Sequence, residues 1–326
     1  MAVYTDVSDE ELAAFVALYD IGAVLAFKGI AEGVENSNFL LHAEAGYYIL
    51  TLYEKRVNPD ELPYFIGLME HLAGAGISCP TPIANRQGET LGTLAGRPAA
   101  IVTFLEGMSI RRPKPDHCHA LGVALAELHR AGADFTMHRK NSLTVDNWRP
   151  LFDLSRARAD EVCGGLAAEI ERELARLEEN WPSDLPVGEI HADLFTDNVF
   201  FLGKELSGII DFYFACTDFF AYDVATCMNA WCFEADESFN VTKARALLKG
   251  YTSVRPFTDA EYDALPLLAR GSALRFLLTR LHDWLTVPDN ALVTPKDPME
   301  YVKKLRFHCG VEGARDYGLT TRDMTR

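Results

Sequence analysis

The chain has 326 residues, of which 48% are apolar, so it can bury a substantial core and build one large or two medium domains. Its 31 basic and 47 acidic side chains give a net charge of −16, which argues against broad electrostatic binding to nucleic acid or to an anionic membrane. No run of about 20 uncharged apolar residues occurs, and the first residues, MAVYTDVSDEEL, are acidic and lack an apolar signal core. We therefore expect a globular cytoplasmic protein.

The seven cysteines are odd in number, include no C-x-x-C pair and lie mostly in apolar or helical contexts. We interpret them as reduced thiols that are mostly buried. The sequence HCH at residues 117–119 opens a helical pattern, in which adjacent side chains point in different directions. These three side chains are therefore not expected to bind one metal ion.

The first 105 residues read as a small sheet with one main helix. SDEELAAFVALY (8–19) has the pattern of a capped helix that begins after Ser8. NSNFLLHAEAGYYILTLYE (36–54) contains two apolar runs separated by AEAG, which predicts a hairpin. ELPYFIGLMEHLAGAG (61–76) follows as a helix that packs behind this hairpin, and ETLGTLAGRPAAIVTFLEG (89–107) supplies two more strands joined at AGRP.

The rest of the chain is mainly helical. The helical patterns cover residues 116–130, about 150–180, 221–234, 240–251, 259–269 and 271–285. Convincing strands in this part flank only the segment GEIHADLFTDNVFF (188–201). We therefore predict a small α+β lobe over residues 1–105 and a larger helical lobe over residues 106–326.

Polar residues stand in this apolar segment in the order H-x-D-x-x-x-x-N, followed by I-I-D-F. They are His191, Asp193, Asn198 and Asp211. Ordinary turn chemistry would account for one or two of them. The residues between Asp193 and Asp211 leave room for a strand NVFFLG, a turn at KE and a returning strand LSGII, so this hairpin should bring both carboxylates to one cleft.

A sheet lobe, a short connector and a helical lobe with these motifs resemble the aminoglycoside phosphotransferase and choline kinase-like family, and within it the branch that acts on L-homoserine. The similar stretches are GVENSNFLL, YYILTLYE, LMEHLAGAGI, TFLEG, HADLFTDNVFF, GIIDFYFACTDFFAYDVA and SALRFLLTRLHDW. The resemblance implies an α+β, protein-kinase-like two-lobe fold with a small antiparallel-sheet N-lobe and a larger, mainly helical C-lobe. It also implies ATP and Mg²⁺ as cofactors.

Catalytic and metal-binding roles follow from the same resemblance. Asp193 would orient or deprotonate a substrate hydroxyl, and His191 would brace its loop. Asn198 and Asp211 would hold Mg²⁺ through oxygen ligands. Asp223, in the matching segment AYDVA, can be explained instead as an N-terminal helix cap.

The nucleotide would meet two stretches of the first lobe. Gly33 lies in a stretch that suits a turn whose amides approach phosphates, although a plain hairpin turn explains it equally well. By resemblance, Ser37 would approach the phosphates, and the connector with Phe104 and Glu106 would meet the adenine through backbone groups.

One position departs from the family pattern. The strand YYILTLYE has Thr51 where kinase-like folds carry a phosphate-binding lysine or arginine. Lys55 lies four residues further, about 13 Å along a strand, so it is no obvious substitute.

The substrate assignment rests on the resemblance, and the choice of substrate residues rests on charge. L-homoserine carries a carboxylate as well as an ammonium group, and a carboxylate favours an arginine partner. Arg275, Thr279 and His282 form a strip along one predicted helix, and we predict Arg275 and His282 as substrate residues, although Arg275 and Arg280 fit a surface location equally well. Weaker candidates are three polar residues of one loop: His138, Arg139 and Asn141.

Three functions stay open at this point. The first is ATP-dependent phosphorylation of the L-homoserine side-chain hydroxyl, and the second is phosphorylation of choline, an amino sugar or another alcohol. The third is a catalytically weak nucleotide-binding module, which only Thr51 supports.

Overall fold

The computed structural model describes residues 5–30, 36–54, 58–287 and 295–320. The chain divides into two compact units. The first contains the described residues up to Glu106 together with Gly208–Ile210, and the second contains Gly107–Ser207 and all the described residues from Asp211 onward. The predicted lobes are each continuous in sequence, whereas the first unit also takes this short later segment.

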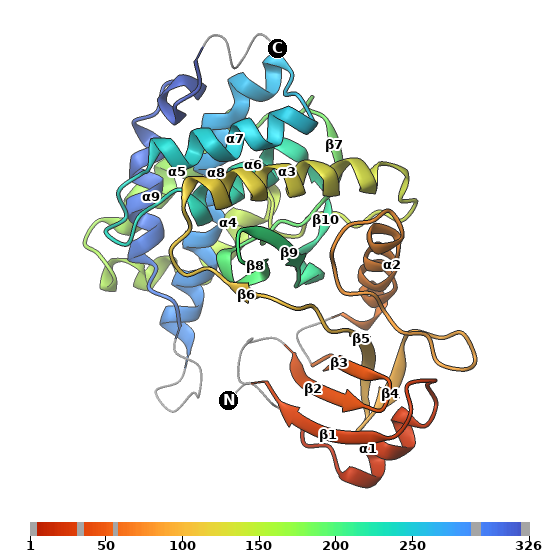
Figure 1. Ribbon diagram of the computed structural model, residues 1–326. Helices are drawn as coiled ribbons and strands as arrows, with labels where there is room; N and C mark the ends of the chain where they lie inside the picture. The colour runs from red at the N-terminus through yellow and green to blue at the C-terminus, as the bar shows by residue number, and fades with distance from the viewer. Residues whose placement is uncertain (1–4, 31–35, 55–57, 288–294, 321–326) are drawn as a thin grey trace. The chain divides into compact units, whose positions relative to one another are not determined.

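The first unit is built on a five-stranded antiparallel sheet (Figure 1). Its strands lie in the order β1-β2-β3-β5-β4, with β1 at Val24–Gly29, β2 at Ser37–Ala43, β3 at Gly46–Leu52, β4 at Gly92–Leu94 and β5 at Arg97–Thr103. The two predicted hairpins, β2–β3 and β4–β5, are confirmed. Strand β1 was not among the predicted strands.

Helix α1 (Asp9–Val16) covers one face of this sheet. The predicted cap is confirmed, because the Ser8 side chain accepts a hydrogen bond from the Glu11 backbone N–H at 3.3 Å. Apolar residues of α1 pack against alternate residues of β2 and β3, among them Phe39 and Leu50. The strand residues between them therefore face away from α1.

Helix α2 (Leu62–Gly74) follows a short 3-10 turn, η1 (Pro59–Glu61), as the apolar spacing predicted. Gly208–Ile210 belongs with this unit because the Ile209 N–H donates to the Ser78 carbonyl at 2.9 Å.

The second unit is mainly helical (Figure 1). Its helices are α3 (Pro115–Ala131), α4 (Val145–Asp153), α5 (Leu166–Asn180), α6 (Phe220–Trp231), α7 (Val241–Val254), α8 (Asp259–Thr286) and α9 (Met299–Cys309). The helix expected over about 150–180 is interrupted by a 3-10 segment, η3 (Arg156–Glu161), and restarts after Gly165, whose φ is +82°. Helix α9 was not predicted.

Residues 259–269 and 271–285, expected as two helices, form the single helix α8. Gly271 does not break it. A Cβ at this position would lie 2.3 Å from the Trp181 ring and 2.8 Å from the Trp148 ring. The glycine therefore serves close packing of α8, not a turn.

The strands of the second unit frame the predicted motif. Strand β7 (Val187–Ile190) pairs with β10 (Cys216–Phe219), and β8 (Val199–Leu202) lies between β6 (Met108–Ser109) and β9 (Glu205–Ile209). The predicted hairpin between Asp193 and Asp211 is confirmed as β8–β9.

Helices α3 and α7 pack with their backbones in close contact. A Cβ on Gly122 would lie 2.1 Å from the Leu247 carbonyl oxygen, and one on Gly250 would lie 2.2 Å from that of His119. Only glycine permits this approach, which brings His129 of α3 and Tyr251 of α7 within hydrogen-bonding distance, at 2.7 Å.

All seven cysteines lie in the described part of the chain. They form no disulfide and five are buried, as predicted. Within the described residues, no helix is both long enough and apolar enough to cross a lipid bilayer.

His308 of α9 lies in the core of the second unit between two hydrogen-bond partners. Its Nδ1 lies 2.8 Å from the Tyr317 hydroxyl, and its Nε2 lies 3.0 Å from Asn229 Oδ1. Burial, reinforced by the nearby charges of Lys304 and Arg270, lowers the pKa of His308 to about 3. The folded unit therefore holds a neutral imidazole at neutral pH.

We predict that the second unit loses stability as the pH falls below about 6.5, because the unfolded chain then binds a proton at His308 that the folded chain excludes. This one group should lower the free energy of unfolding by about 2 kcal/mol at pH 5 relative to pH 8. All four tryptophans lie in this unit, so urea unfolding followed by tryptophan fluorescence reports on it. His308→Gln should flatten the pH dependence, whereas exposed His119→Gln should keep it; equal slopes in all three proteins would contradict the assignment.

Candidate active site

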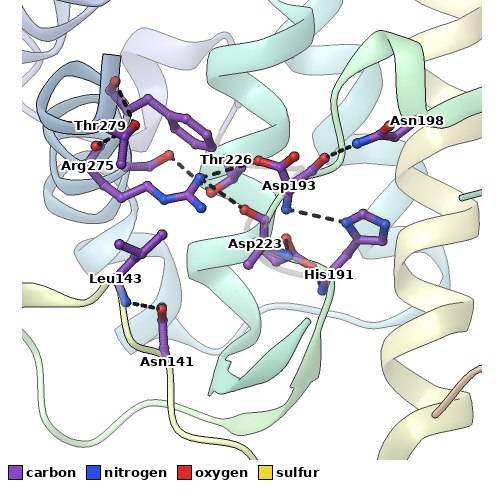
Figure 2. A network of polar contacts seen from close by, with 12 residues as sticks. Asn141, Leu143, His191, Asp193, Asn198, Asp223, Thr226, Arg275 and Thr279 are labelled. Carbon is purple, nitrogen blue, oxygen red and sulfur yellow. Dashed lines mark hydrogen bonds and ion pairs between the residues drawn. The ribbon is translucent and has the colours of Figure 1, made fainter. Parts of the chain in front are cut away.

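The predicted catalytic residues lie on the loop between β7 and β8, which ends in the 3-10 turn η4 (Thr196–Asn198). Helix α6 holds the backbone of this loop. The Asp223 carboxylate, fully buried in the first turn of α6, accepts hydrogen bonds from the N–H of His191 at 2.7 Å and of Ala192 at 2.9 Å (Figure 2). Ala192 has a φ of +61°, a conformation that this pair of bonds stabilises.

A second bond from α6 holds the other side of the same loop. Trp231, the last residue of α6, donates its indole N–H to the Leu194 carbonyl at 2.8 Å and is fully buried. Two points near opposite ends of one helix thus fix the backbone on both sides of Asp193.

Asp223 is itself held by a buried chain of polar groups. His129 Nε2 lies 3.1 Å from Asp223, and His129 Nδ1 lies 2.7 Å from the Tyr251 hydroxyl. Arg255 donates to this hydroxyl at 3.3 Å and to Glu261 at 2.8 Å. Although burial opposes ionisation, the bonds from His129 and the His191 N–H lower the pKa of Asp223, while burial lowers the pKa of His129.

The cap predicted for Asp223 is wrong. The N-cap of α6 is Phe219, and the Asp223 side chain bonds the loop before β8 instead of its own helix. The role is structural, as expected, but its partner is 31 residues away. An aspartate inside the apolar helix FAYDVATCMNAW was the available signal, because a buried charge requires dedicated partners.

Asp193 lies at the centre of the site with its side chain 18% exposed. Its backbone N–H donates to His191 Nδ1 at 3.3 Å, so His191 braces the loop from inside the core. Burial raises the pKa of Asp193, and the nearby Arg275 guanidinium, 3.5 Å from Oδ1, opposes this rise. A raised pKa makes the carboxylate a stronger proton acceptor than an exposed aspartate.

The two predicted metal ligands flank the β8–β9 hairpin in the sequence, Asn198 directly before β8 and Asp211 shortly after β9. The Asn198 amide nitrogen donates to the Asp193 carbonyl at 2.8 Å, which leaves the amide oxygen as the atom that can bind a cation. Asp211 is exposed and has a φ of +68°, immediately before the 3-10 turn η5 (Phe212–Phe214).

This pair of oxygen donors fits Mg²⁺, which commonly binds one or two carboxylates and completes its shell with water and phosphate oxygens. The described part of the chain has no group of three or more His, Cys, Asp or Glu side chains able to hold a metal ion.

The two arginines of α8 with a predicted surface alternative are not surface residues. Arg275 is 4% exposed and pairs with Asp193, and Arg280 is buried and pairs with Glu300. The surface alternative for both arginines is wrong. His282, two helical turns beyond Arg275, has a buried Nδ1 without a hydrogen-bond partner among the described residues.

The loop with the weaker substrate candidates is docked on β10. Its backbone forms a bridge to Thr217, whose hydroxyl also accepts from the Arg139 N–H at 3.2 Å. Asn141 donates to Asp218 at 2.7 Å, and His138 lies 3.3 Å from the buried Glu189. These contacts order the loop and account for its polar residues.

The nucleotide candidates of the first unit are placed as follows. Gly33 and Lys55 lie outside the described residues. Ser37 is fully buried and donates to Glu54 at 2.7 Å, and the other Glu54 oxygen lies 3.3 Å from Arg97. This buried Glu54 cluster was missed from the sequence.

Thr51 lies on the sheet face that points away from α1. It pairs with Asn38 across β2 and β3, and its hydroxyl donates to the Asn38 side chain at 2.8 Å. Beyond β5, Phe104 is 42% exposed with its ring 6.1 Å from that of Tyr47, and Glu106 is exposed.

Comparison with known proteins identifies the family. A sequence profile described as "Phosphotransferase enzyme family" matches residues 26–257, which include the hairpin β2–β3, the loop of Asp193, η5 and helix α6. The chain belongs to the phosphotransferase enzyme family.

One curated family relative, from Brucella anthropi, is named homoserine kinase. It is 65% identical over 319 residues, which cover 98% of each chain. Among solved structures, choline kinase from Cryptosporidium parvum superposes with a TM-score of 0.68 at 14% identity, over 93% of this chain and 94% of that one. A spectinomycin phosphotransferase bound to ADP and spectinomycin gives a TM-score of 0.68 at 15% identity, over 97% of this chain and 99% of that one.

These likenesses confirm the predicted resemblance and the predicted fold class. The fold is protein-kinase-like, as in the two solved structures. The chain also has the expected α+β composition, with a small antiparallel sheet and a larger helical part.

We predict that Asp223→Asn lowers both stability and turnover, although Asp223 is not proposed to contact substrate. The asparagine side chain has one acceptor oxygen, so it cannot replace both oxygens that accept the His191 and Ala192 hydrogen bonds. The free energy of unfolding should fall by about 1–3 kcal/mol. Misplacement of the loop should lower kcat by about 10-fold per folded molecule. Kinetics normalised to the folded fraction test this, and an unchanged kcat would show that Asp193 does not depend on Asp223.

Proposed function

We propose that the chain is an ATP-dependent kinase that phosphorylates the side-chain hydroxyl of L-homoserine, giving O-phospho-L-homoserine and ADP. The observation that carries the substrate is the 65% identity, over 98% of both chains, to a protein named homoserine kinase. The buried loop that presents Asp193 supports the chemistry independently of that name.

In this reaction the homoserine hydroxyl oxygen forms a bond to the γ-phosphorus of ATP, and the bond from that phosphorus to the bridging oxygen of ADP breaks. Asp193 is proposed to accept the hydroxyl proton. Its raised pKa suits this role, and the bonds of His191 and Asn198 to its backbone hold it in place. His191 is thus a positioning residue.

We propose Asn198 and Asp211 as the Mg²⁺ ligands, through the amide oxygen and the carboxylate. Mg²⁺ when bound neutralises phosphate charge in this class of reaction. The first unit, corresponding to the predicted lobe 1–105, would bind the nucleotide, with Gly33 and Ser37 near the phosphates and Phe104 and Glu106 near the adenine. The predicted lobe 106–326 would supply the catalytic loop and the substrate residues.

Further parts of the proposal follow from the sequence. The acidic net charge and the absence of a membrane-spanning helix among the described residues suit a cytoplasmic enzyme that binds small molecules rather than nucleic acid or membrane. His282 stays a prediction as a residue that meets homoserine directly, whereas Arg275, predicted for the same role, pairs with Asp193.

The decisive experiment is Mg-dependent ATP turnover by the purified protein with L-homoserine, choline, an amino sugar and simple alcohols. We expect L-homoserine to be phosphorylated and the others to react much more slowly. Asp193→Asn should lower kcat by about 10²- to 10⁴-fold because the proton acceptor is lost. Exposed Asp197→Asn, in the same loop, is the matched control and should retain activity. Turnover of choline alone would remove the substrate assignment, and normal turnover by Asp193→Asn would remove the base.

The metal proposal predicts unequal effects at its two ligands. Asp211→Ala should weaken Mg²⁺ binding more than Asn198→Ala, because it removes a full negative charge from the metal's surroundings. Turnover by Asp211→Ala should therefore need the higher Mg²⁺ concentration. Titration of activity with Mg²⁺ at fixed ATP, alongside Mg-dependent binding of a fluorescent ATP analogue, measures the difference. An unchanged Mg²⁺ titration in Asp211→Ala would reject this ligand.

A further inference from the structure

Arg275 occupies an enclosed position beside the catalytic loop (Figure 2). Its Nη1 lies 3.4 Å from the Ala192 carbonyl and 3.5 Å from Asp193 Oδ1. The centre of its guanidinium group lies 3.9 Å from the ring centroid of Phe276 and 5.2 Å from that of Phe214. The planar group is therefore held by aromatic rings while its edge points at the backbone and side chain of the loop.

Packing of helix α8, which carries Arg275, fixes the position of this guanidinium group. Buried polar contacts join α8 to α6: the Thr226 and Ser272 hydroxyls lie 3.0 Å apart, and Asn229 donates to the Ala269 carbonyl at 2.9 Å. On another side of α8, Gly271 permits close packing of the ring of Trp181. Since α6 also carries Asp223, the same helix pair fixes both the backbone of the loop and Arg275.

The loop contacts leave one freedom at Asp193. Asp223, Trp231, His191 and Asn198 all bond main-chain atoms of residues 191–194. Within the described chain, the side chain that contacts the Asp193 carboxylate is that of Arg275. Main-chain bonds alone do not select the side-chain rotamer. A donor at Oδ1 does, and it leaves the second oxygen to face a hydroxyl.

We propose that Arg275 is a positioning residue that holds the Asp193 carboxylate in its reactive orientation, and that it does not bind the substrate carboxylate. This inference rests on the proposed kinase function. It replaces the role predicted for Arg275 from its charge alone. Arg275 also contacts a second segment, because Phe214 belongs to the turn that follows Asp211. One guanidinium group therefore contacts both the loop that carries Asp193 and the turn after Asp211.

Arg275→Gln separates the two roles. If Arg275 positions Asp193, kcat should fall by about 10²-fold, the scale expected when a reacting group is misplaced, with KM for L-homoserine and ATP changed by no more than about threefold. The dissociation constant for L-homoserine, measured by calorimetry with a non-hydrolysable ATP analogue, should stay within the same limits. Arg275→Lys keeps the charge but loses the planar fork, so about a 10-fold loss of kcat is expected.

Arg280→Gln is the matched control, since Arg280 lies five residues along the same helix, is also buried, pairs with Glu300 and stacks on Tyr301. It should lower stability but keep wild-type kcat per folded molecule. Weaker L-homoserine binding in Arg275→Gln, with or without a fall in kcat, would overturn the proposal, because the guanidinium group would then touch substrate. Unchanged kcat would overturn it too.

Two safeguards keep the result interpretable. If Arg275→Gln does not fold, as judged by tryptophan fluorescence, Arg275→Lys decides, and wild-type kcat in that variant rejects the positioning role. If the wild-type protein does not phosphorylate L-homoserine, the proposed substrate fails on its own, and the same comparison is made with the alcohol that it does phosphorylate.

Discussion

The buried carboxylate of Asp223 is the interaction on which the candidate site depends. The loop before β8 runs through the core, where an unpaired backbone N–H is costly, and the left-handed conformation of Ala192 turns two consecutive N–H groups toward one point. An anion at that point satisfies both. The first turn of α6 is a favourable place for it, because the helix N-terminus stabilises negative charge and His129 donates from behind. Asp193 is placed by this arrangement before any ligand is present.

The sequence was sufficient to select the residues proposed to take part in the reaction, and insufficient to identify the residues that hold them. Asp193, Asn198 and Asp211 belong to a local pattern, in which polar residues interrupt apolar strands at the ends of one hairpin. The partners of Asp223 are 94 and 31 residues away, and Tyr251 is 122 residues from His129, so no periodic pattern connects them. The predicted break of α8 at Gly271 was wrong for a related reason. A glycine in a helical pattern indicates either a break or a close approach, and only the position of Trp181 shows that close approach applies here.

In the first unit, the alternation of side chains along the strands assigns residues to the two faces of the sheet. Ser37 pairs with Leu52, so it shares the face that packs under α1, whereas Thr51 pairs with Asn38 on the other face. The hairpin register alone therefore places Ser37 and Thr51 on opposite faces of the sheet. The buried Glu54 that gathers the Ser37 hydroxyl and Arg97 could not be foreseen, because a glutamate at the end of an apolar strand usually faces water.

The separations of the loop contacts along the chain also bear on how an active molecule is made. Asp223 lies 32 residues beyond His191, but Arg275 lies 82 residues beyond Asp193. A ribosome releases the amino-terminal part first, so the emerging chain can bind its loop backbone to α6 while α8 is still unsynthesised. The aspartate is then anchored but its side chain is not yet oriented. Synthesis of α8 completes the site last, so a truncated product that ends before this helix would lack the residue proposed to orient the Asp193 carboxylate.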